Sequence, residues 1–225
     1  HQQLVESGTL SIAETPLGKI ASNADKSQSS SRALSLHVAE QLHAHTAKKK
    51  PGQSAGAGFE HIIAEFLEAT FPYMQSVRPG DWSILNVGSS RRRDHLAVYE
   101  PYTHLASLAE AIRLNPDLGA SLGNNYVISP DILVLRNAIS DDVLNQDRVI
   151  VDEHTGTLSP VRAANRAAPT AHVHAVISCK WTMRSDRSQN TRAEALNLIR
   201  NRKGRSPHII AVTNEPTMSR IASLA

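Results

Sequence analysis

The chain has 225 residues, of which 40% are hydrophobic, and a formal net charge of +3 from 24 Lys and Arg against 21 Asp and Glu. This suits one globular domain over residues 1–225, and the small basic excess hints only weakly at a polyanionic partner. The single cysteine excludes an intramolecular disulfide and fits a reducing cytoplasm. No apolar run approaches the ~20 residues of a membrane span, so no membrane partner is expected.

In chain order, residues 1–31 are polar and irregular, and we expect an N-terminal arm or loop there. Apolar residues at helical spacing predict helices over 32–46 and 56–71. Glu60 lies beside the apolar stripe of the second helix. The members of that stripe are Phe59, Ile62, Ile63, Phe66 and Leu67.

The remaining segments alternate between strand-like and helix-like patterns. We predict strand and turn over 82–100, a helical region over 101–122 that breaks near Pro116, strands over 131–136, 171–181 and 207–213, and a helix over 190–202. This order predicts a mixed α/β domain with a central sheet.

The strand predicted over 171–181 carries Lys180 near its end. Side chains alternate across a strand, so Ser178 and Lys180 point to the same side, opposite an apolar face. The residues of this more polar face are His172, His174, Val176, Ser178 and Lys180. Spacing alone leaves a catalytic lysine and a surface lysine equally open, although Cys179 and Trp181 are unusual neighbours for a surface position.

An acid opens the earlier strand, because Asp131 follows Pro130 and precedes an apolar run. An acid at the start of one strand and a lysine at the end of a later one are typical of metal-dependent phosphodiesterases. Pro-Asp alone also marks ordinary turns. Mg²⁺ prefers oxygen ligands and keeps several waters, so the Asp131 carboxylate and the Cys179 backbone carbonyl are candidate ligands.

The position two residues before Lys180 is Ser178, where such an arrangement normally has a second carboxylate. Serine supplies no negative charge. Glu194 is the first candidate for the displaced acid, because we expect it about one turn into the next helix, with its side chain reaching back over the strand end. Glu60 is the second candidate. For each of them the alternative is an ordinary solvated glutamate on a helix.

The segment Arg184-Ser185-Asp186-Arg187 lies between that strand and the next helix. Arginine binds guanine O6 and N7 bidentately, and aspartate accepts a hydrogen bond from cytosine N4. The segment therefore has the hydrogen-bonding groups that read G·C pairs. A capped helix start with local ion pairs is the alternative.

Taken together, these segments resemble the NgoMIV type II restriction endonucleases, which have the PD-(D/E)xK nuclease fold. The resemblance spans nearly the whole chain. It is carried by residues 22–25, 51–53, 59–60, 78–82, 130–132, 177–182, 184–187, 196–198 and 200–205. So many matches in the same order are far more specific than an acid and a lysine alone.

The resemblance implies a restriction-endonuclease-like α/β core, with a central mixed β-sheet flanked by helices. It also implies that the displaced acid is Glu194. The catalytic residues implied in this way are Glu60, Asp131, Ser178, Lys180 and Glu194. Asp131, the Cys179 carbonyl and Glu194 would hold Mg²⁺, with two ions expected in each active site.

The resemblance further implies a palindromic DNA site with a CCGG core. Similar enzymes cut GCCGGC and act as tetramers that bridge two sites. The implied DNA contacts are Arg184, Asp186 and Arg187 for the core, Asp25, Ser27 and Arg220 for the outer pair, and Gln53 in the minor groove. We therefore expect a bacterial cytoplasmic enzyme that binds double-stranded DNA as a dimer or tetramer and leaves 5′-phosphates.

Two features depart from the family pattern. Family members continue beyond the position of Ala225, so a C-terminal segment is expected to be missing here, which bears on tetramer assembly. The run Arg91-Arg92-Arg93 is denser than the family pattern and is either a phosphate contact or a solvated turn.

Three other functions fit parts of the sequence. A structure- or mismatch-directed repair nuclease of the same fold would not need the Arg-Ser-Asp-Arg segment. An inactive DNA-binding protein would be favoured if Asp131 or Lys180 were missing, and both are present. A serine–lysine amidohydrolase would use Ser178 as nucleophile and Lys180 as base, without a metal.

Overall fold

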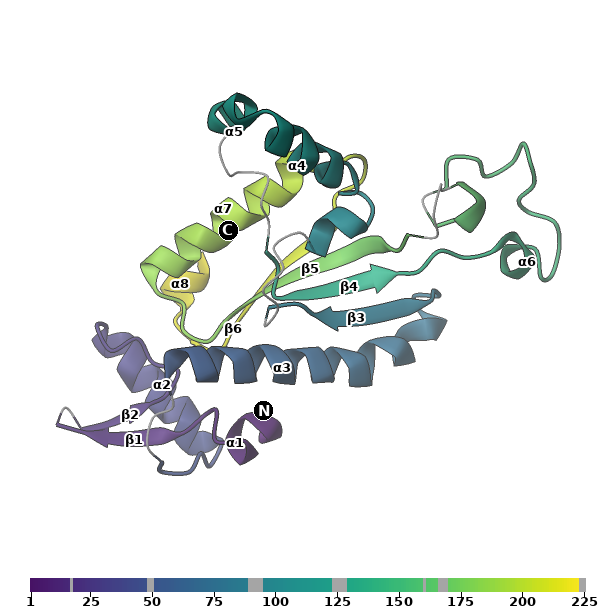
Figure 1. The fold of residues 1–225 in the computed structure, drawn as a ribbon. Coiled ribbons are helices and arrows are strands. Elements are labelled where there is room, and N and C mark those ends of the chain that lie inside the picture. Colours follow the sequence, from purple (N-terminus) through teal and green to yellow (C-terminus); the bar gives the residue numbers. More distant parts are fainter. Residues whose placement is uncertain are drawn as a thin grey trace. The chain divides into compact units, whose positions relative to one another are not determined.

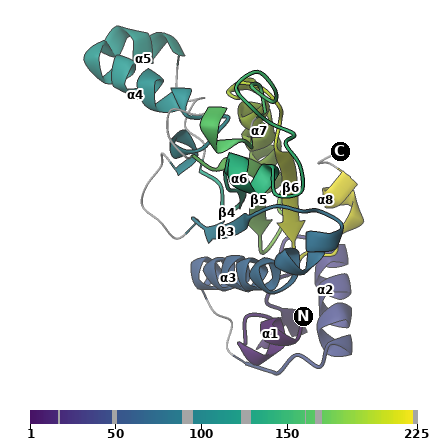
Figure 2. The same ribbon diagram turned by 90° about the vertical axis from the view of Figure 1, so that its right-hand side faces the viewer.

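The computed structural model describes residues 1–16, 18–47, 51–88, 95–122, 129–159, 161–165 and 170–222 (Figures 1 and 2). Two compact units can be distinguished. Unit 1 comprises residues 1–66, 177–195 and 210–225, and unit 2 comprises residues 67–176 and 196–209. Four elements contribute residues to both units: α3 (Gly52–Thr70), β5 (His172–Lys180), α7 (Ser185–Arg200) and β6 (His208–Thr213).

The N-terminal stretch of unit 1 is folded, so the expectation of an irregular arm is wrong. It forms α1 (Gln2–Glu6) and an antiparallel hairpin of β1 (Ile12–Thr15) and β2 (Gly18–Ala21), followed by α2 (Ser29–Gln41). The hydroxyl of Ser22 accepts a bond from the Ser11 amide at 3.1 Å and donates to the Thr9 carbonyl at 2.8 Å. The buried Ser22 hydroxyl thus satisfies one backbone amide and one backbone carbonyl. Hydroxyl groups can do this because they both donate and accept hydrogen bonds, so a polar sequence can form a regular fold here.

Helix α3 carries the apolar stripe predicted for it, with one exception. Phe59 and Ile62 are buried, and the Phe59 ring meets the edge of the Trp181 ring with centroids 5.5 Å apart. Phe66, however, is 58% exposed, so its predicted burial is wrong. The buried face instead includes the small side chains of Ala55 and Ala64. Helical periodicity alone does not distinguish which edge of a stripe meets neighbouring structure.

Unit 2 has its core around β3 (Trp82–Asn86) and β4 (Ile132–Arg136), which pair antiparallel. The helices α4 (His104–Leu114) and α5 (Pro116–Leu122) follow one another in this unit. The buried side chains of the core are Val87, Leu96, Tyr102, Leu105, Leu133, Leu135, Val173, Val176 and Leu198. Burial raises the pKa of Tyr102 to about 12, and its hydroxyl donates to the Leu198 carbonyl at 3.0 Å.

The strand order is β3-β4-β5-β6, which gives a four-stranded mixed sheet with flanking helices and confirms the predicted fold class. Strand β5 shows the predicted alternation, since Val173, Ala175, Ile177 and Cys179 are buried. Val176, placed on the more polar face, is also buried because it joins the core of unit 2. None of the helices in the described ranges has the length and apolarity needed to cross a membrane.

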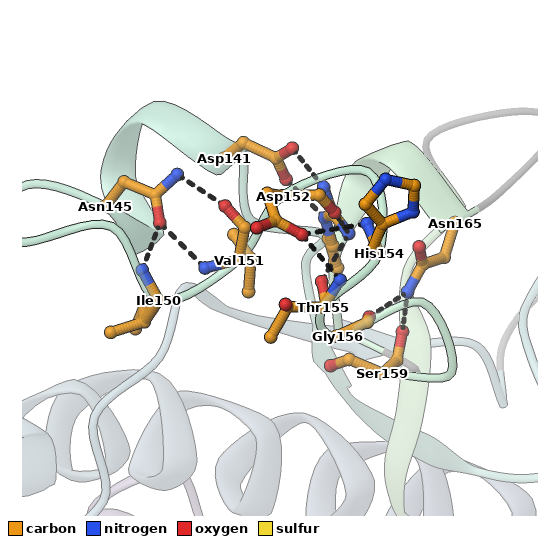
Figure 3. Close-up of polar contacts among 11 residues, drawn as sticks. Asp141, Asn145, Ile150, Val151, Asp152, His154, Thr155, Gly156, Ser159 and Asn165 are labelled. Atoms are coloured by element: carbon orange, nitrogen blue, oxygen red, sulfur yellow. Dashed lines mark hydrogen bonds and ion pairs between the residues drawn. The ribbon is translucent and has the colours of Figure 1, made fainter.

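Polar contacts hold together the described residues 137–159 and 161–165 between β4 and β5 (Figure 3). It includes α6 (Asp141–Leu144) and a short 3₁₀ turn (Ala163–Asn165). The buried Arg162 guanidinium binds both Asp141 carboxylate oxygens, at 2.6 and 2.5 Å, and holds the pKa of that carboxyl below its usual range. Such bidentate pairs fix geometry as well as charge.

The segment Arg78–Trp82, part of the family resemblance, forms a turn beside β3. Arg78 lies 2.6 Å from Nε2 of His174, and the Trp82 indole donates to the Arg78 carbonyl at 3.2 Å. A Cβ on Gly80 would come within 2.8 Å of the Trp82 ring, so this close approach requires glycine. The segment therefore builds an aromatic and histidine cluster in unit 2.

His174 in this cluster gives a prediction about pH. Burial, together with the nearby His208, Arg78, Arg136 and His172, lowers the pKa of His174 to about 4. An unfolded histidine has a pKa near 6.5, so between these values the unfolded chain binds more protons. Stability contributed by neutral His174 is therefore complete above about pH 6.5 and is lost as the pH falls toward 4.

We expect His174→Phe, which keeps a ring against Trp82 and His208, to reduce this loss. Thermal unfolding of wild type and variant from pH 7.5 to 4 measures it, and the exposed His37→Phe serves as the control. Equal acid-induced drops in Tm for wild type and His174→Phe would contradict the prediction.

Candidate active site

Three predicted catalytic side chains meet in unit 1 around one carboxylate. The Ser178 hydroxyl donates to Oε2 of Glu194 at 3.2 Å, and Nζ of Lys180 lies 3.8 Å from the same oxygen. The Lys180 side chain is 17% exposed and that of Glu194 is 41% exposed. A negative charge therefore lies beside the strand position where Ser178 supplies none.

Glu194 reaches this position from the middle of α7, and not from about one turn into the helix as predicted. The helix begins at Ser185, five residues before the predicted start at residue 190. Ser185, Asp186 and Arg187 form its first turn. The longer helix still brings the Glu194 carboxylate to the end of β5, so the predicted pairing with Ser178 and Lys180 does not depend on the predicted helix start.

The arrangement argues against a serine–lysine hydrolase. Such an enzyme needs its base within reach of the serine proton. Here the Ser178 hydroxyl donates to Glu194, and the Lys180 ammonium is paired with that same carboxylate. A serine whose hydroxyl donates to a carboxylate is not aligned to give its proton to a lysine.

The other predicted ligands lie on different elements. Asp131 is half-buried just before β4 in unit 2, where its carbonyl accepts bonds from the amides of Val87 and Gly88, each at 2.9 Å. Glu60 is half-buried on α3 in unit 1, and Cys179 is buried in β5. Within the described ranges, no group of three or more His, Cys, Asp and Glu side chains is arranged to hold a metal ion.

The predicted base-reading segment lies at the start of α7. Arg184 and Asp186 form an exposed ion pair at 3.6 Å, which matches the local pairing considered as an alternative. Arg187 is half-buried and donates to the Thr182 carbonyl at 3.3 Å. An exposed pair of this kind contributes little to stability, so both charges remain available for exchange with a ligand.

The residues predicted to read the outer pair lie in the same unit. Oδ1 of Asp25 accepts bonds from the Ser27 amide at 3.0 Å and hydroxyl at 2.7 Å. Burial opposes ionisation of Asp25, but these two bonds and the charges of Arg220 and Arg184 lower its pKa overall. Arg220 donates to the Ser185 hydroxyl at 2.6 Å. Gln53 is exposed at the start of α3.

One buried acid of unit 1 was missed by sequence reasoning. Glu215 is 1% exposed and accepts hydrogen bonds from Ser31, Thr217 and the amide of Met183. In the sequence it lies between Asn214 and Pro216 after an apolar strand, where an acid most often marks a solvated turn. The sequence feature that could have indicated its burial is its position two residues after the end of an apolar strand.

Unit 2 contains a separate basic feature, a cavity of about 1000 Å³ beside the His174 cluster. One acid, Glu100, lies in its wall. The arginine and lysine side chains around it are Arg78, Arg136, Lys203 and Arg205, and His172, His174 and His208 also line it. The charge of this wall favours anionic groups such as phosphates.

Comparison with known proteins identifies the family. The family model described as NgoMIV restriction enzyme matches residues 1–225. The chain is also 47% identical over 226 residues to the type II restriction enzyme NgoMIV of Neisseria gonorrhoeae, covering 100% of this chain and 77% of that protein.

The chain belongs to the NgoMIV restriction enzyme family.

Membership of the NgoMIV restriction enzyme family confirms the predicted resemblance along the whole chain. It also agrees with the mixed four-stranded sheet found here. The roles assigned to individual residues of the active site and of the base-reading segments stay predictions. The Arg91–Arg93 run lies outside the described residues.

Proposed function

We propose that this type II restriction endonuclease cuts double-stranded DNA at GCCGGC with Mg²⁺ and leaves 5′-phosphates. Its family gives the general activity, which is site-specific hydrolysis of DNA. The observation that carries the finer proposal is the contact of one Glu194 oxygen with both Ser178 and Lys180. This contact supplies the acid that the serine position lacks.

The donor set supports a hard divalent cation. Restriction endonucleases generally depend on divalent metals. The Asp131 and Glu194 carboxylates and the Cys179 carbonyl would hold two Mg²⁺ ions, with Glu60 completing the acidic site. Mg²⁺ needs few protein ligands because waters and phosphate oxygens fill its remaining positions. When bound, it would polarise the scissile phosphate and lower the pKa of the attacking water.

Lys180 has a distinct role in this proposal. Its ammonium group would orient the attacking water and neutralise the negative charge that develops on the phosphate. Partial burial at the end of β5 strengthens such an electrostatic effect, because less water screens it. The carboxylate of Glu194 would keep that ammonium group beside the reacting atoms.

The proposed readers of the DNA sequence are charged and polar side chains of unit 1. Arg184, Asp186 and Arg187 would read the CCGG core, while Asp25, Ser27 and Arg220 would read the outer pair. Gln53 would contact the minor groove. The basic cavity of unit 2 supports phosphate binding, which adds affinity without sequence information.

A palindromic site also suggests how the protein assembles. A two-fold symmetric DNA sequence is matched by a two-fold symmetric protein, so we propose a dimer or a tetramer in which each subunit reads one half-site. We place the enzyme in the bacterial cytoplasm, where DNA is accessible and the single buried thiol of Cys179 stays reduced.

Digestion of plasmid DNA tests the proposal. A plasmid with GCCGGC sites should give discrete fragments with Mg²⁺ and none with EDTA. A matched plasmid with one base pair of each CCGG core changed should stay intact. The fragment ends should accept labelled phosphate from a kinase only after phosphatase treatment. Cutting at unpaired or mismatched positions instead would indicate a repair nuclease, and no cutting by the folded, full-length enzyme would reject the proposal.

The base-reading role of Arg187 can be measured separately. Arg187→Ala should cost roughly 1–3 kcal/mol of discrimination if the guanidinium reads guanine bidentately. Binding of GCCGGC and of a duplex with one changed core pair gives this difference. Arg192→Ala, on an exposed part of the same helix, is the matched control. An unchanged preference in Arg187→Ala would reject the assignment.

A further inference from the structure

Glu215 lies in unit 1, in the chain between β6 and α8 (Met218–Ala222). Its carboxylate accepts three hydrogen bonds. The Ser31 hydroxyl donates to Oε1 at 2.6 Å and the Thr217 hydroxyl at 3.0 Å, while the Met183 amide donates to Oε2 at 2.7 Å. Both carboxylate oxygens thus accept hydrogen bonds from the protein, and the residue is only 1% exposed to solvent.

A buried carboxylate is a poor means of gaining stability. Removing a charge from water is costly, and well-packed apolar residues at such positions often give equal or greater stability. Three hydrogen bonds to one carboxylate do constrain the positions of the donors, because each donor must keep its distance and angle to the same group. Glu215 therefore fixes the relative positions of the three chain segments that donate to it.

Each of those segments carries residues proposed to read DNA. Met183 immediately precedes Arg184 at the start of α7. Thr217 leads into α8, which carries Arg220, and Arg220 in turn contacts Ser185. The Ser31 hydroxyl, while donating to Glu215, accepts a bond from the Asp25 amide at 2.9 Å.

Further bonds join the same three segments around Glu215. The Thr182 hydroxyl donates to the Asn23 carbonyl at 3.0 Å, and the Asn23 side chain donates to the Asn214 carbonyl at 2.5 Å. These bonds connect the turn before α2, the loop after β5 and the turn after β6. These bonds therefore join segments that are far apart in sequence and that carry the proposed reading groups.

We propose that Glu215 is a positioning residue for base recognition, whose carboxylate aligns the segments carrying Asp25, Arg184–Arg187 and Arg220 into one reading surface. This rests on the proposed function, in which those side chains read the GCCGGC site. Glu215 itself is buried and does not touch DNA. Its effect is therefore on the choice of sequence rather than on the chemical step.

Three shape-conserving variants test this role. Glu215→Gln removes the charge, Thr217→Val removes one donor without changing the volume, and Ser31→Ala removes another. Ser121→Ala is the matched control, because it deletes a serine hydroxyl-to-carbonyl hydrogen bond of 3.0 Å in α5 of unit 2. The measurement is the ratio of affinities for a GCCGGC duplex and for a duplex with one changed core pair.

We expect Glu215→Gln to lower this ratio by about tenfold and the two single-donor variants to lower it less, because each loses fewer directed bonds. Ser121→Ala should keep the wild-type ratio. A structural role alone would lower the Tm and weaken binding to both duplexes equally, leaving the ratio unchanged, and that result would overturn the proposal. If Glu215→Gln does not fold, Thr217→Val and Ser31→Ala decide the question.

The preference of the wild-type protein for GCCGGC distinguishes a failure of the proposed function from a failure of the role given to Glu215. If the wild type shows no preference for GCCGGC, the proposed function fails first. If the wild type discriminates and all folded variants discriminate equally well, only the role of Glu215 is wrong.

Discussion

Replacing Lys180 with alanine should abolish DNA cleavage while leaving specific binding intact. The ammonium group of Lys180 lies 3.8 Å from Glu194 at the end of β5, where it is proposed to orient water and neutralise developing charge. Loss of one such electrostatic and positioning group slows a reaction by at least about 100-fold. The base-reading side chains lie on other segments, so affinity for the GCCGGC duplex should change little.

Single-turnover cleavage and a metal-free gel-shift assay measure these two quantities separately. Lys19→Ala, which removes an exposed lysine from β2, controls for the loss of general positive charge. The free energy of unfolding should change by less than about 1 kcal/mol, since partly exposed ion pairs contribute little. A Lys180→Ala enzyme that cuts at the wild-type rate would show that the role given to this lysine is wrong.

Glu194→Gln should have an effect of similar size, but with a different dependence on metal. The amide retains the shape of the side chain and an acceptor for the Ser178 hydroxyl, while the charge is lost. A ligand set without this charge binds Mg²⁺ less tightly, so cleavage should fall by at least about 100-fold and part of the loss should be recovered at high Mg²⁺. Glu68→Gln, on the exposed side of α3, is the control.

A double variant tests whether the negative charge of Glu194 is still effective when it is supplied from β5 instead of α7. Ser178→Asp combined with Glu194→Ser moves the carboxylate from the helix to the strand. The two native side chains meet at 3.2 Å, so the relocated acid should lie near the original one. We expect the double variant to cut faster than Glu194→Ser alone. Equal rates would mean that Glu194 acts through something other than its charge at that place.

Several elements of the fold were predictable because their signals are local. The apolar run of β4 and the alternation along β5 follow from the two-residue period of a strand, and both strands lie where predicted. The predicted helix over 190–202 began too late, because the polar residues 185–189 carry no apolar period. The structure of residues 1–31 also lacks an apolar period, since a buried serine hydroxyl, that of Ser22, bonds to their backbone.

The active-site prediction depended on two different kinds of information. Strand alternation placed Ser178 and Lys180 on the same side of β5, and this is a property of any regular strand. The choice of Glu194 over other helical glutamates came from the family resemblance. In the structure Glu194 contacts both residues, although it lies deeper in α7 than predicted.

The family, the α/β class and the four strands of the main sheet follow from the sequence alone, because they depend on motifs and on apolar periods that neighbouring residues share. The partners of the individual acids, in contrast, are set by tertiary packing. Glu194 meets Ser178 across 16 positions of sequence, and Glu215 meets Ser31 across 184. Contacts of this kind depend on how separate segments pack, and no local period encodes them.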